Sequence, residues 1–306
     1  MNKLTKIGVS ALCGSLAAIS AASAGDLAVT GSATATYSSN EGETTGNPIG
    51  MFSGITFKGT GELDNGTSFT ATFAGDDQSS YSNTDIVFDV PGIGKIAIDN
   101  GAGGTGIDIV DDMMPTAWEE TNGTSLATGL ATIAGVGGST NIAWSVGSDM
   151  LPDGLSVDLA YAPRVGASGT NDKVASGDKG GNSGSGWDIV LQHSGLMDGL
   201  NAWVGYSQID AAAETSDGNR TQTAIGATYA VGSVTVGYQE TRDNLASRDT
   251  GTSFYDNQAY GISFSVNDDL SLSCGEHKSD KALVNGGATV ENKTASLQVA
   301  YTMGGA

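Results

Sequence analysis

Apolar and polar residues alternate one by one along most of this chain. The first clear example is LAVTGSATATY, Leu27 to Tyr37, which places Leu, Val, Ala and Tyr on one side and Thr and Ser on the other. A period of two residues is that of a β-strand with one apolar and one polar face. The same alternation predicts further strands at about 51–63, 67–74, 84–90, 94–100, 140–147, 155–162, 187–193, 200–208, 221–230, 233–241, 258–266, 270–276 and 294–301. No long segment beyond residue 24 has helical spacing, and we expect only a short helical turn at 115–120, so the chain is all-β with about fourteen strands.

The connections between these segments alternate in length. Short turns such as Asp64-Asn65-Gly66 follow every second strand, and Asn-Gly suits the positive φ angles of a tight hairpin turn. Between them lie longer polar stretches, among them 38–50, 163–186 and 243–257. A soluble β-sandwich has no reason to sort its loops in this way. A transmembrane antiparallel up-and-down β-barrel does, because one rim carries tight turns and the other carries long loops.

The two faces of the predicted strands differ in charge, and this difference indicates their orientation. The apolar face is continuous and carries little charge. The polar face carries Lys58, Glu62, Asp85, Asp89, Lys95, Asp158, Asp188, Gln192, Gln239 and Gln298. A tilted strand of about 9–11 residues crosses a bilayer, and only a closed barrel satisfies its backbone groups within lipid. We therefore expect the apolar face to meet lipid and the polar face to line a water-filled bore.

Residues 1–24 predict a cleaved secretory signal peptide. Lys3 and Lys6 precede a short apolar segment, and Ala22-Ser23-Ala24 matches a cleavage site. Its removal leaves 25–306 with 13 − 2 = 11 basic and 34 acidic residues, a formal charge of −23 and one cysteine, Cys274. A single cysteine cannot form an internal disulfide. The acidic balance, with no basic patch in the sequence, argues against nucleic-acid binding.

Residues 100–140 form the longest interruption of the strand pattern. Structureless loops longer than about 12–15 residues are uncommon and usually functional. This segment carries a cluster of carboxylates: Asp108, Asp111, Asp112, Glu119 and Glu120. We expect the segment to fold into the bore and to narrow it. A solvated surface loop is the alternative interpretation.

With these features the chain resembles the general porins of Gram-negative outer membranes, in particular the alphaproteobacterial type. The resemblance is carried by ASA before GDLAVTG, the hairpin ELDNGTSF, the acidic long loop, and the late segments QAYGISFSVNDDLSLS and SLQVAYTMGG. It implies a sixteen-stranded barrel, a homotrimer in outer-membrane lipid, and passive diffusion of small hydrophilic solutes. It also implies that the loop at 100–140 forms the constriction of the porin barrel at 25–306.

The chain departs from that family pattern in two places. It stops at Met303-Gly304-Gly305-Ala306, where the family has a last strand ending in an aromatic residue, so we expect the last hairpin to be missing. Such porins also oppose the acidic loop with arginines on the barrel wall. Here the arginines mostly fall in or beside the long loops: Arg164, Arg220, Arg242 and Arg248. The candidates for charged wall residues at the constriction are instead Lys58, Lys95 and Glu62.

A bore lined by carboxylates and hydroxyls concentrates cations and repels anions. We therefore expect a cation-preferring channel without a cofactor; Ca²⁺ bound by the acidic loops is an alternative, since carboxylate oxygens suit that ion. We do not expect an enzyme, because the two histidines, His193 and His277, have no serine motif beside them. The rival function is a secreted or surface β-sheet adhesin or binding protein without a pore, which would leave the sorted loops unexplained.

Overall fold

The computed structural model describes residues 25–37, 49–77, 83–121, 130–166, 183–211, 218–245, 252–283, 287 and 289–302. The predicted signal peptide at 1–24, Arg248 and the last four residues, 303–306, lie outside these ranges. Among the described residues, no helix is long and apolar enough to cross a membrane.

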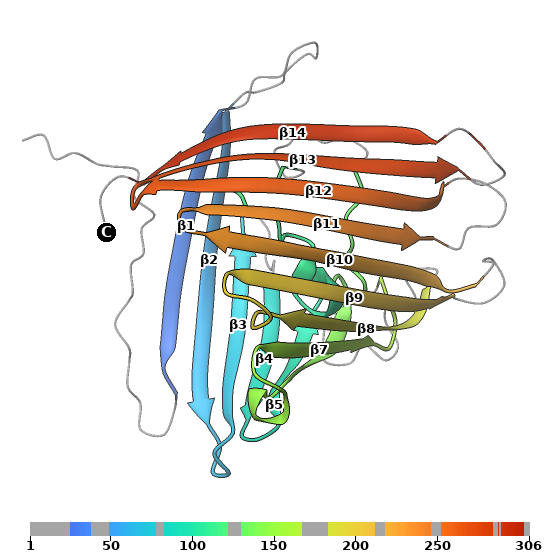
Figure 1. The fold of residues 1–306 in the computed structure, drawn as a ribbon. Helices are drawn as coiled ribbons and strands as arrows, with labels where there is room; N and C mark the ends of the chain where they lie inside the picture. The colour runs from blue at the N-terminus through green and yellow to red at the C-terminus, as the bar shows by residue number, and fades with distance from the viewer. Residues whose placement is uncertain are drawn as a thin grey trace, which may run out of the picture.

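The described residues form one antiparallel up-and-down sheet of fourteen strands (Figure 1). The strands are β1 (Leu27–Tyr37), β2 (Ile49–Glu62), β3 (Ser68–Asp76), β4 (Asn83–Val90), β5 (Gly94–Asn100), β6 (Thr140–Val146), β7 (Leu155–Ala162), β8 (Ser183–His193), β9 (Leu200–Ala211), β10 (Arg220–Val231), β11 (Val234–Asn244), β12 (Thr252–Asn267), β13 (Leu270–Leu283) and β14 (Val290–Tyr301). Strands adjacent in sequence are adjacent in the sheet, and β1 and β14 lie at its two ends, so the sheet is not closed.

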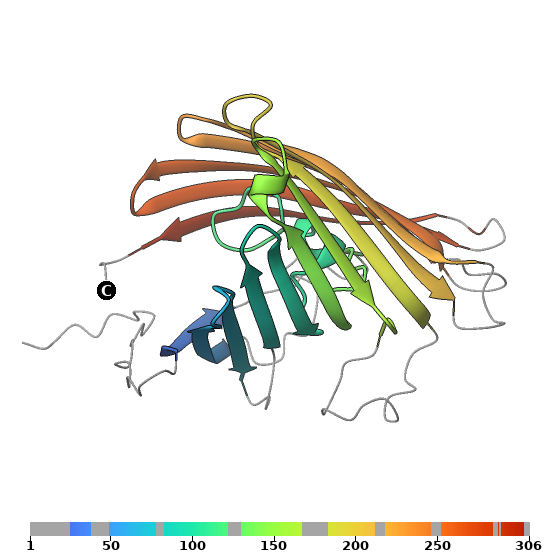
Figure 2. The ribbon, with the colours of Figure 1, turned by 90° about the horizontal axis from the view of Figure 1, so that it is seen from below.

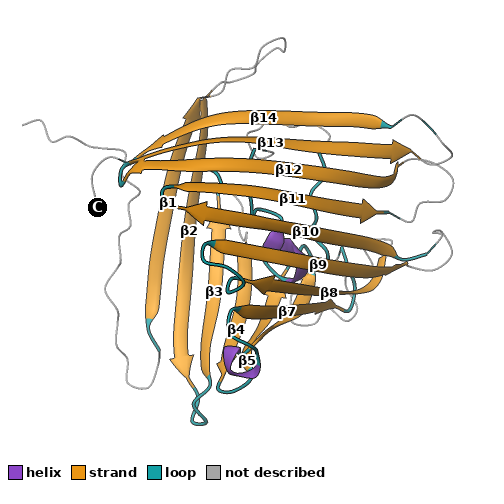
Figure 3. Cartoon of the chain, viewed as in Figure 1, coloured by secondary structure: helices purple, strands orange, loops and turns teal. Residues whose placement is uncertain are grey.

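The predicted strands are all present, and the helical turn lies at a different place. Residues 115–120 are not helical; the short 3-10 helices are instead η1 (Gly106–Val110) and η2 (Ser148–Met150). Both are purple in Figure 3, and the rest of the described part of the chain is strand or loop. The prediction at 115–120 was wrong because the backbone there is held by the wall of the sheet, as described below, and not by bonds within a helix.

The side chains of the sheet are arranged with the apolar face outward. Phe57 is 42% exposed and Val299 is 66% exposed, whereas the polar side chains of Asp188 and Gln222 are each 1% exposed. Figure 2 shows the sheet curved into a trough, with the segment that joins β5 to β6 on its concave side. The predicted orientation is therefore confirmed, because the apolar side chains do not gather in a dry centre.

Tight hairpin turns set the register at one rim. Between β2 and β3, Leu63 N donates to Thr67 O over 2.8 Å and Gly66 N donates to Leu63 O over 2.9 Å. Gly66 has a φ of 82°, which a residue without a Cβ adopts at little cost. The Asn65 side chain accepts a hydrogen bond from Thr67 N, which closes the turn. The strand spacing that this turn imposes places Lys58 beside Thr72 and Asp85 on the polar face.

Strands β11 to β14 continue beyond the limits that alternation predicts. The rings of Tyr238 and Tyr260 lie 5.1 Å apart on the outer face. Further toward the long-loop rim, that face carries ion pairs, such as Lys293–Glu276 at 2.7 Å and Lys278–Glu291 at 3.0 Å. A charged side chain facing the middle of a bilayer costs about 2–4 kcal/mol. In a barrel that spans a bilayer, these strand ends would therefore lie beyond the hydrocarbon, and the ion pairs explain why the sequence alternation is lost there.

Candidate functional site

Residues 101–121 and 130–139, which lie between β5 and β6 in the sequence, pack against the concave face of the sheet (Figure 2). Ile107 and Val110 of η1 are fully buried, together with Ile133 from the returning part of the segment. They form one apolar cluster with Val190, Trp203 and Ala224 of β8, β9 and β10. Full burial of an aliphatic side chain contributes about 1.5–3 kcal/mol. This cluster holds these loop residues, together called the docked loop, on the wall, and Val136 adds a second apolar contact with Ala160, Ala162 and Ile209.

Polar side chains of the wall bind the backbone of the docked loop. Asp188 Oδ2 on β8 accepts hydrogen bonds from Ile107 N and Val136 N, each over 3.0 Å. Gln222 Oε1 on β10 accepts from Gly135 N over 2.6 Å and from Ala134 N over 3.3 Å. These bonds satisfy backbone groups that the loop cannot pair within itself.

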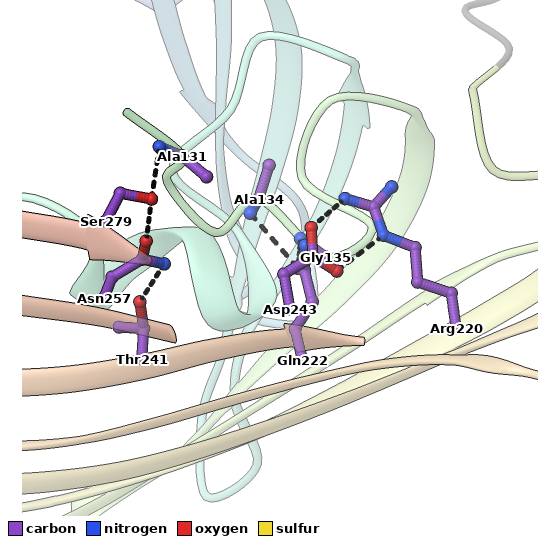
Figure 4. A network of polar contacts seen from close by, with 9 residues as sticks. All are labelled: Ala131, Ala134, Gly135, Arg220, Gln222, Thr241, Asp243, Asn257 and Ser279. Atoms are coloured by element: carbon purple, nitrogen blue, oxygen red, sulfur yellow. Dashed lines mark hydrogen bonds and ion pairs between the residues drawn. The ribbon is translucent and has the colours of Figure 1, made fainter. Parts of the chain in front are cut away.

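The same arrangement continues toward the end of the sheet. Figure 4 shows Ala131 N donating to Ser279 Oγ over 3.3 Å, while Ser279 in turn donates to Asn257 over 2.6 Å. On β14, Gln298 Oε1 accepts from Trp118 N and Glu119 N, and its Nε2 donates to Glu119 O over 2.6 Å. Wall side chains from β8 to β14 therefore bind the loop within η1 and at residues 117–119 and 131–136.

A furrow of glycines in the wall gives the loop room. Gly237, Gly261 and Gly275 are register neighbours on β11, β12 and β13. A Cβ on Gly237 would lie 2.5 Å from Pro115, and one on Gly275 would lie 2.4 Å from Thr121. The absence of side chains at these positions lets residues 115–121 lie directly on the strands.

The five predicted carboxylates all belong to the docked loop, and their environments differ. Burial raises the pKa of Asp108, although the 2.6 Å hydrogen bond from Gly104 N partly offsets the effect. Burial, with the charge of Asp112 beside it, raises the pKa of Asp111 to about 8. Burial and then the charge of Glu120 raise the pKa of Asp112. At neutral pH the loop therefore carries fewer charges than its sequence suggests.

Glu119 and Glu120 form a second acidic pair. A hydrogen bond between the two carboxyl groups, followed by burial, raises the pKa of Glu119 to about 7. Within the described residues, no Lys, Arg or His side chain forms an ion pair with any of the five loop carboxyls. Their charge is consequently not neutralised by direct partners in that part of the chain.

The three predicted wall residues lie on a different part of the sheet. Lys58 and Glu62 belong to β2 and Lys95 to β5, whereas the loop is held on β8 to β14 (Figure 1). Lys95 is the register neighbour of Asp89, so its positive charge stands next to a carboxylate on the wall. Among the described residues, no hydrogen bond or ion pair joins these three side chains to the loop.

Sequence reasoning missed the residues that hold the loop. Asp188, Gln239 and Gln298 were predicted only as members of the polar face, and the furrow glycines were not singled out. A usable signal existed, because Gly237, Gly261 and Gly275 all fall on polar-face positions of consecutive strands. Of the described residues, no three His, Cys, Asp or Glu side chains lie together in a metal-binding arrangement.

The geometry can be compared with known proteins. Residues 8–306 match the family model described as Gram-negative porin. The fold is similar to that of Salmonella typhi OmpF in complex with daunomycin, with a TM-score of 0.61 and 14% identity over 92% of this chain and 87% of that chain. It is also similar to a porin structure refined at 1.8 Å, with a TM-score of 0.63 and 14% identity over 91% and 90%. For OmpT of Vibrio cholerae the TM-score is 0.59, with 14% identity over 94% and 85%. No curated protein matches the chain in sequence.

Proposed function

Because the chain belongs to the Gram-negative porin family, we propose that it is a porin whose docked loop forms the constriction of a cation-preferring channel in the outer membrane. Small hydrophilic solutes and ions would cross this channel by passive diffusion. The proposal also includes export with cleavage after Ala24, a homotrimer, and outer-membrane lipid around its apolar face.

One observation carries the proposal: the long acidic loop lies on the polar concave face and not on the rim. Asp188, Gln222 and Gln298 fix its backbone there, and their side chains come from three different strands. A surface loop of an adhesin would need no such row of partners inside the trough. An acidic segment held in the bore acts on ions where screening by bulk water is weakest.

The charge balance favours cations over anions. The loop presents Asp108, Asp112 and Glu120 without ion-pair partners among the described residues, against Lys58 and Lys95 on the opposite part of the wall. Carboxylates lining a narrow path attract cations and repel anions. Asp111 contributes little charge at neutral pH, since its pKa is about 8.

Reversal potentials test this function. The full-length protein is inserted into planar bilayers under a tenfold KCl gradient, and we expect a potential of the sign that indicates K⁺ preference. Replacing Asp108, Asp111 and Asp112 by Asn together should reduce it. The matched control replaces three carboxylates of the turn rim by Asn: Asp64, Asp149 and Asp153. Absence of channels would overturn the pore, and anion preference would overturn the charge argument.

The remaining parts of the proposal have separate measurements. N-terminal sequencing of protein from the outer membrane should give Gly25 as the first residue. Chemical cross-linking in native membranes should give a limit at trimers. If only monomers were found, the homotrimer would be refuted, but the proposed channel function would not be affected.

A further inference from the structure

A small cavity lies between the docked loop and the wall. It has a volume of about 20 Å³, which suffices for one water molecule. Its polar lining comes from Asp111 and Thr132 on the loop, Gln239 and Thr241 on β11, Asn257 on β12 and His277 on β13. The cavity is therefore a place where one residue of the acidic cluster meets three strands.

Two buried wall atoms at this cavity have no hydrogen-bond partner among the residues that the structure describes. Gln239 is 3% exposed, and its Nε2 donates to Val110 O over 2.6 Å, but its Oε1 accepts no hydrogen bond. His277 is 8% exposed, and its Nε2 has no partner. Thr241 and Asn257 are already bonded to each other over 2.9 Å. Leaving a buried polar atom unsatisfied costs about 1–3 kcal/mol, which a shared water molecule avoids.

We propose that this cavity binds one water molecule held jointly by Asp111, Gln239 and His277, and that this water couples the docking of the loop to the protonation of Asp111. Protonated Asp111 donates to the water, and the water donates to Gln239 Oε1 and to the Nε2 of neutral His277 or accepts from it. Ionised Asp111 would place an unpaired charge at the same point. The water site and its coupling to docking do not depend on the proposed function. Only the consequence, a change in the width of the constriction, rests on it.

The charged groups around Asp111 set the direction of the effect. On the loop these are Asp112, Asp108 and Glu120, and all three oppose its ionisation. From the wall, His277 is the titratable group at the cavity, while β11 and β12 contribute neutral side chains. Arg220 and Asp243 form an ion pair with each other, with 2.6 Å between Arg220 Nη2 and Asp243 Oδ2. No cation among these groups compensates a carboxylate at Asp111 while His277 is neutral.

The pH dependence follows from linkage. The docked loop holds the proton of Asp111 up to a pKa of about 8, whereas a carboxyl group in solvent has a value of 3.8. A proton bound more tightly in the docked state favours docking at low pH. Docking is therefore strongest below about pH 4, weakens as the pH rises toward 8, and levels off above it.

Hydrogen exchange on the full-length protein in detergent tests the coupling. The amides of Ala131, Ala134 and Gly135 donate to Ser279 and Gln222 of the wall, so their protection reports docking. After correction for intrinsic exchange, we expect protection to fall about tenfold or more between pH 5 and pH 8. In Asp111→Asn the fall should be clearly smaller, and what remains comes from the other loop carboxyls with raised pKa values, such as Glu119. An equal fall in the two proteins would overturn the coupling. The control Asp149→Asn, at η2, should behave like the unchanged protein.

A crystal structure at high resolution tests the water itself. We expect a single water peak within hydrogen-bond distance of Asp111, Gln239 Oε1 and His277 Nε2. A dry cavity or a metal ion in it would overturn the site, and pH-independent protection in the unchanged protein would overturn the coupling. Hydrogen exchange in detergent does not depend on ion flow through a channel. The coupling can therefore be refuted while the channel function stands, and the channel function can be refuted while the coupling stands.

Discussion

The glycine furrow makes the position of the loop sensitive to a single methyl group. In Gly261→Ala the new Cβ would lie 2.8 Å from both Pro115 Cδ and Pro115 O, which is 0.6 Å short of the 3.4 Å at which ordinary contact begins. One of these atoms belongs to the backbone and cannot rotate away, so the loop itself must retreat. Overpacking of this kind costs about 1–3 kcal/mol. The displacement is toward the bore, since the wall lies on the other side.

Two measurements detect the displacement of the loop in Gly261→Ala. The urea midpoint of the refolded protein should fall, and the single-channel current should become smaller and noisier as Pro115 moves inward. The matched control is Gly59→Ala on β2, where a Cβ meets nothing within 4 Å. Gly237→Ala contacts the same Pro115, so the double variant should cost less than the sum of the single ones. If Gly261→Ala and Gly59→Ala give the same midpoint and the same current, the loop does not rest in the furrow.

Two further perturbations address the acidic pair and its support. Gln298→Leu removes three hydrogen bonds to the backbone of Trp118 and Glu119, each of which contributes about 0.5–1.5 kcal/mol. Glu-C protease should therefore cut the loop faster than in the control Gln258→Leu, whose side chain faces outward. Equal cleavage rates would contradict the docking role of Gln298. The pKa of Glu119 is raised to about 7, so this group ionises between pH 6 and pH 8 and cation preference should increase over that range. Glu119→Gln should flatten the increase in reversal potential, and a decrease with pH in the unchanged protein would refute the assignment.

Much of the fold was predictable because a strand with one apolar and one polar face leaves a period of two in the sequence. The limits of β12 and β13 were not predictable, because residues such as Lys278 and Asp280 form ion pairs on the outer face where the alternation ends. That the loop folds into the bore was predicted from its length, its charge, the barrel pattern around it and the resemblance to porins. Its partners were not, because Gln298 and Trp118 are 180 residues apart and only the register of the strands brings them together.

The protonation of the cluster also escaped sequence reasoning. Five acidic residues in a short segment suggest five charges, but burial against the wall and contact with one another raise the pKa values of Asp111 and Glu119 into the neutral range. Such shifts depend on how much water each carboxyl group loses, which no spacing of residues reveals.

The docked loop contacts side chains and glycines of seven consecutive strands, β8 to β14, and all of these positions lie on the concave face of the sheet. A slip of one residue between any two of these strands would turn the following partners toward lipid. The loop can therefore settle only on a wall whose pairing is correct throughout. A sheet with one mispaired strand would therefore leave part of the acidic loop without its partners.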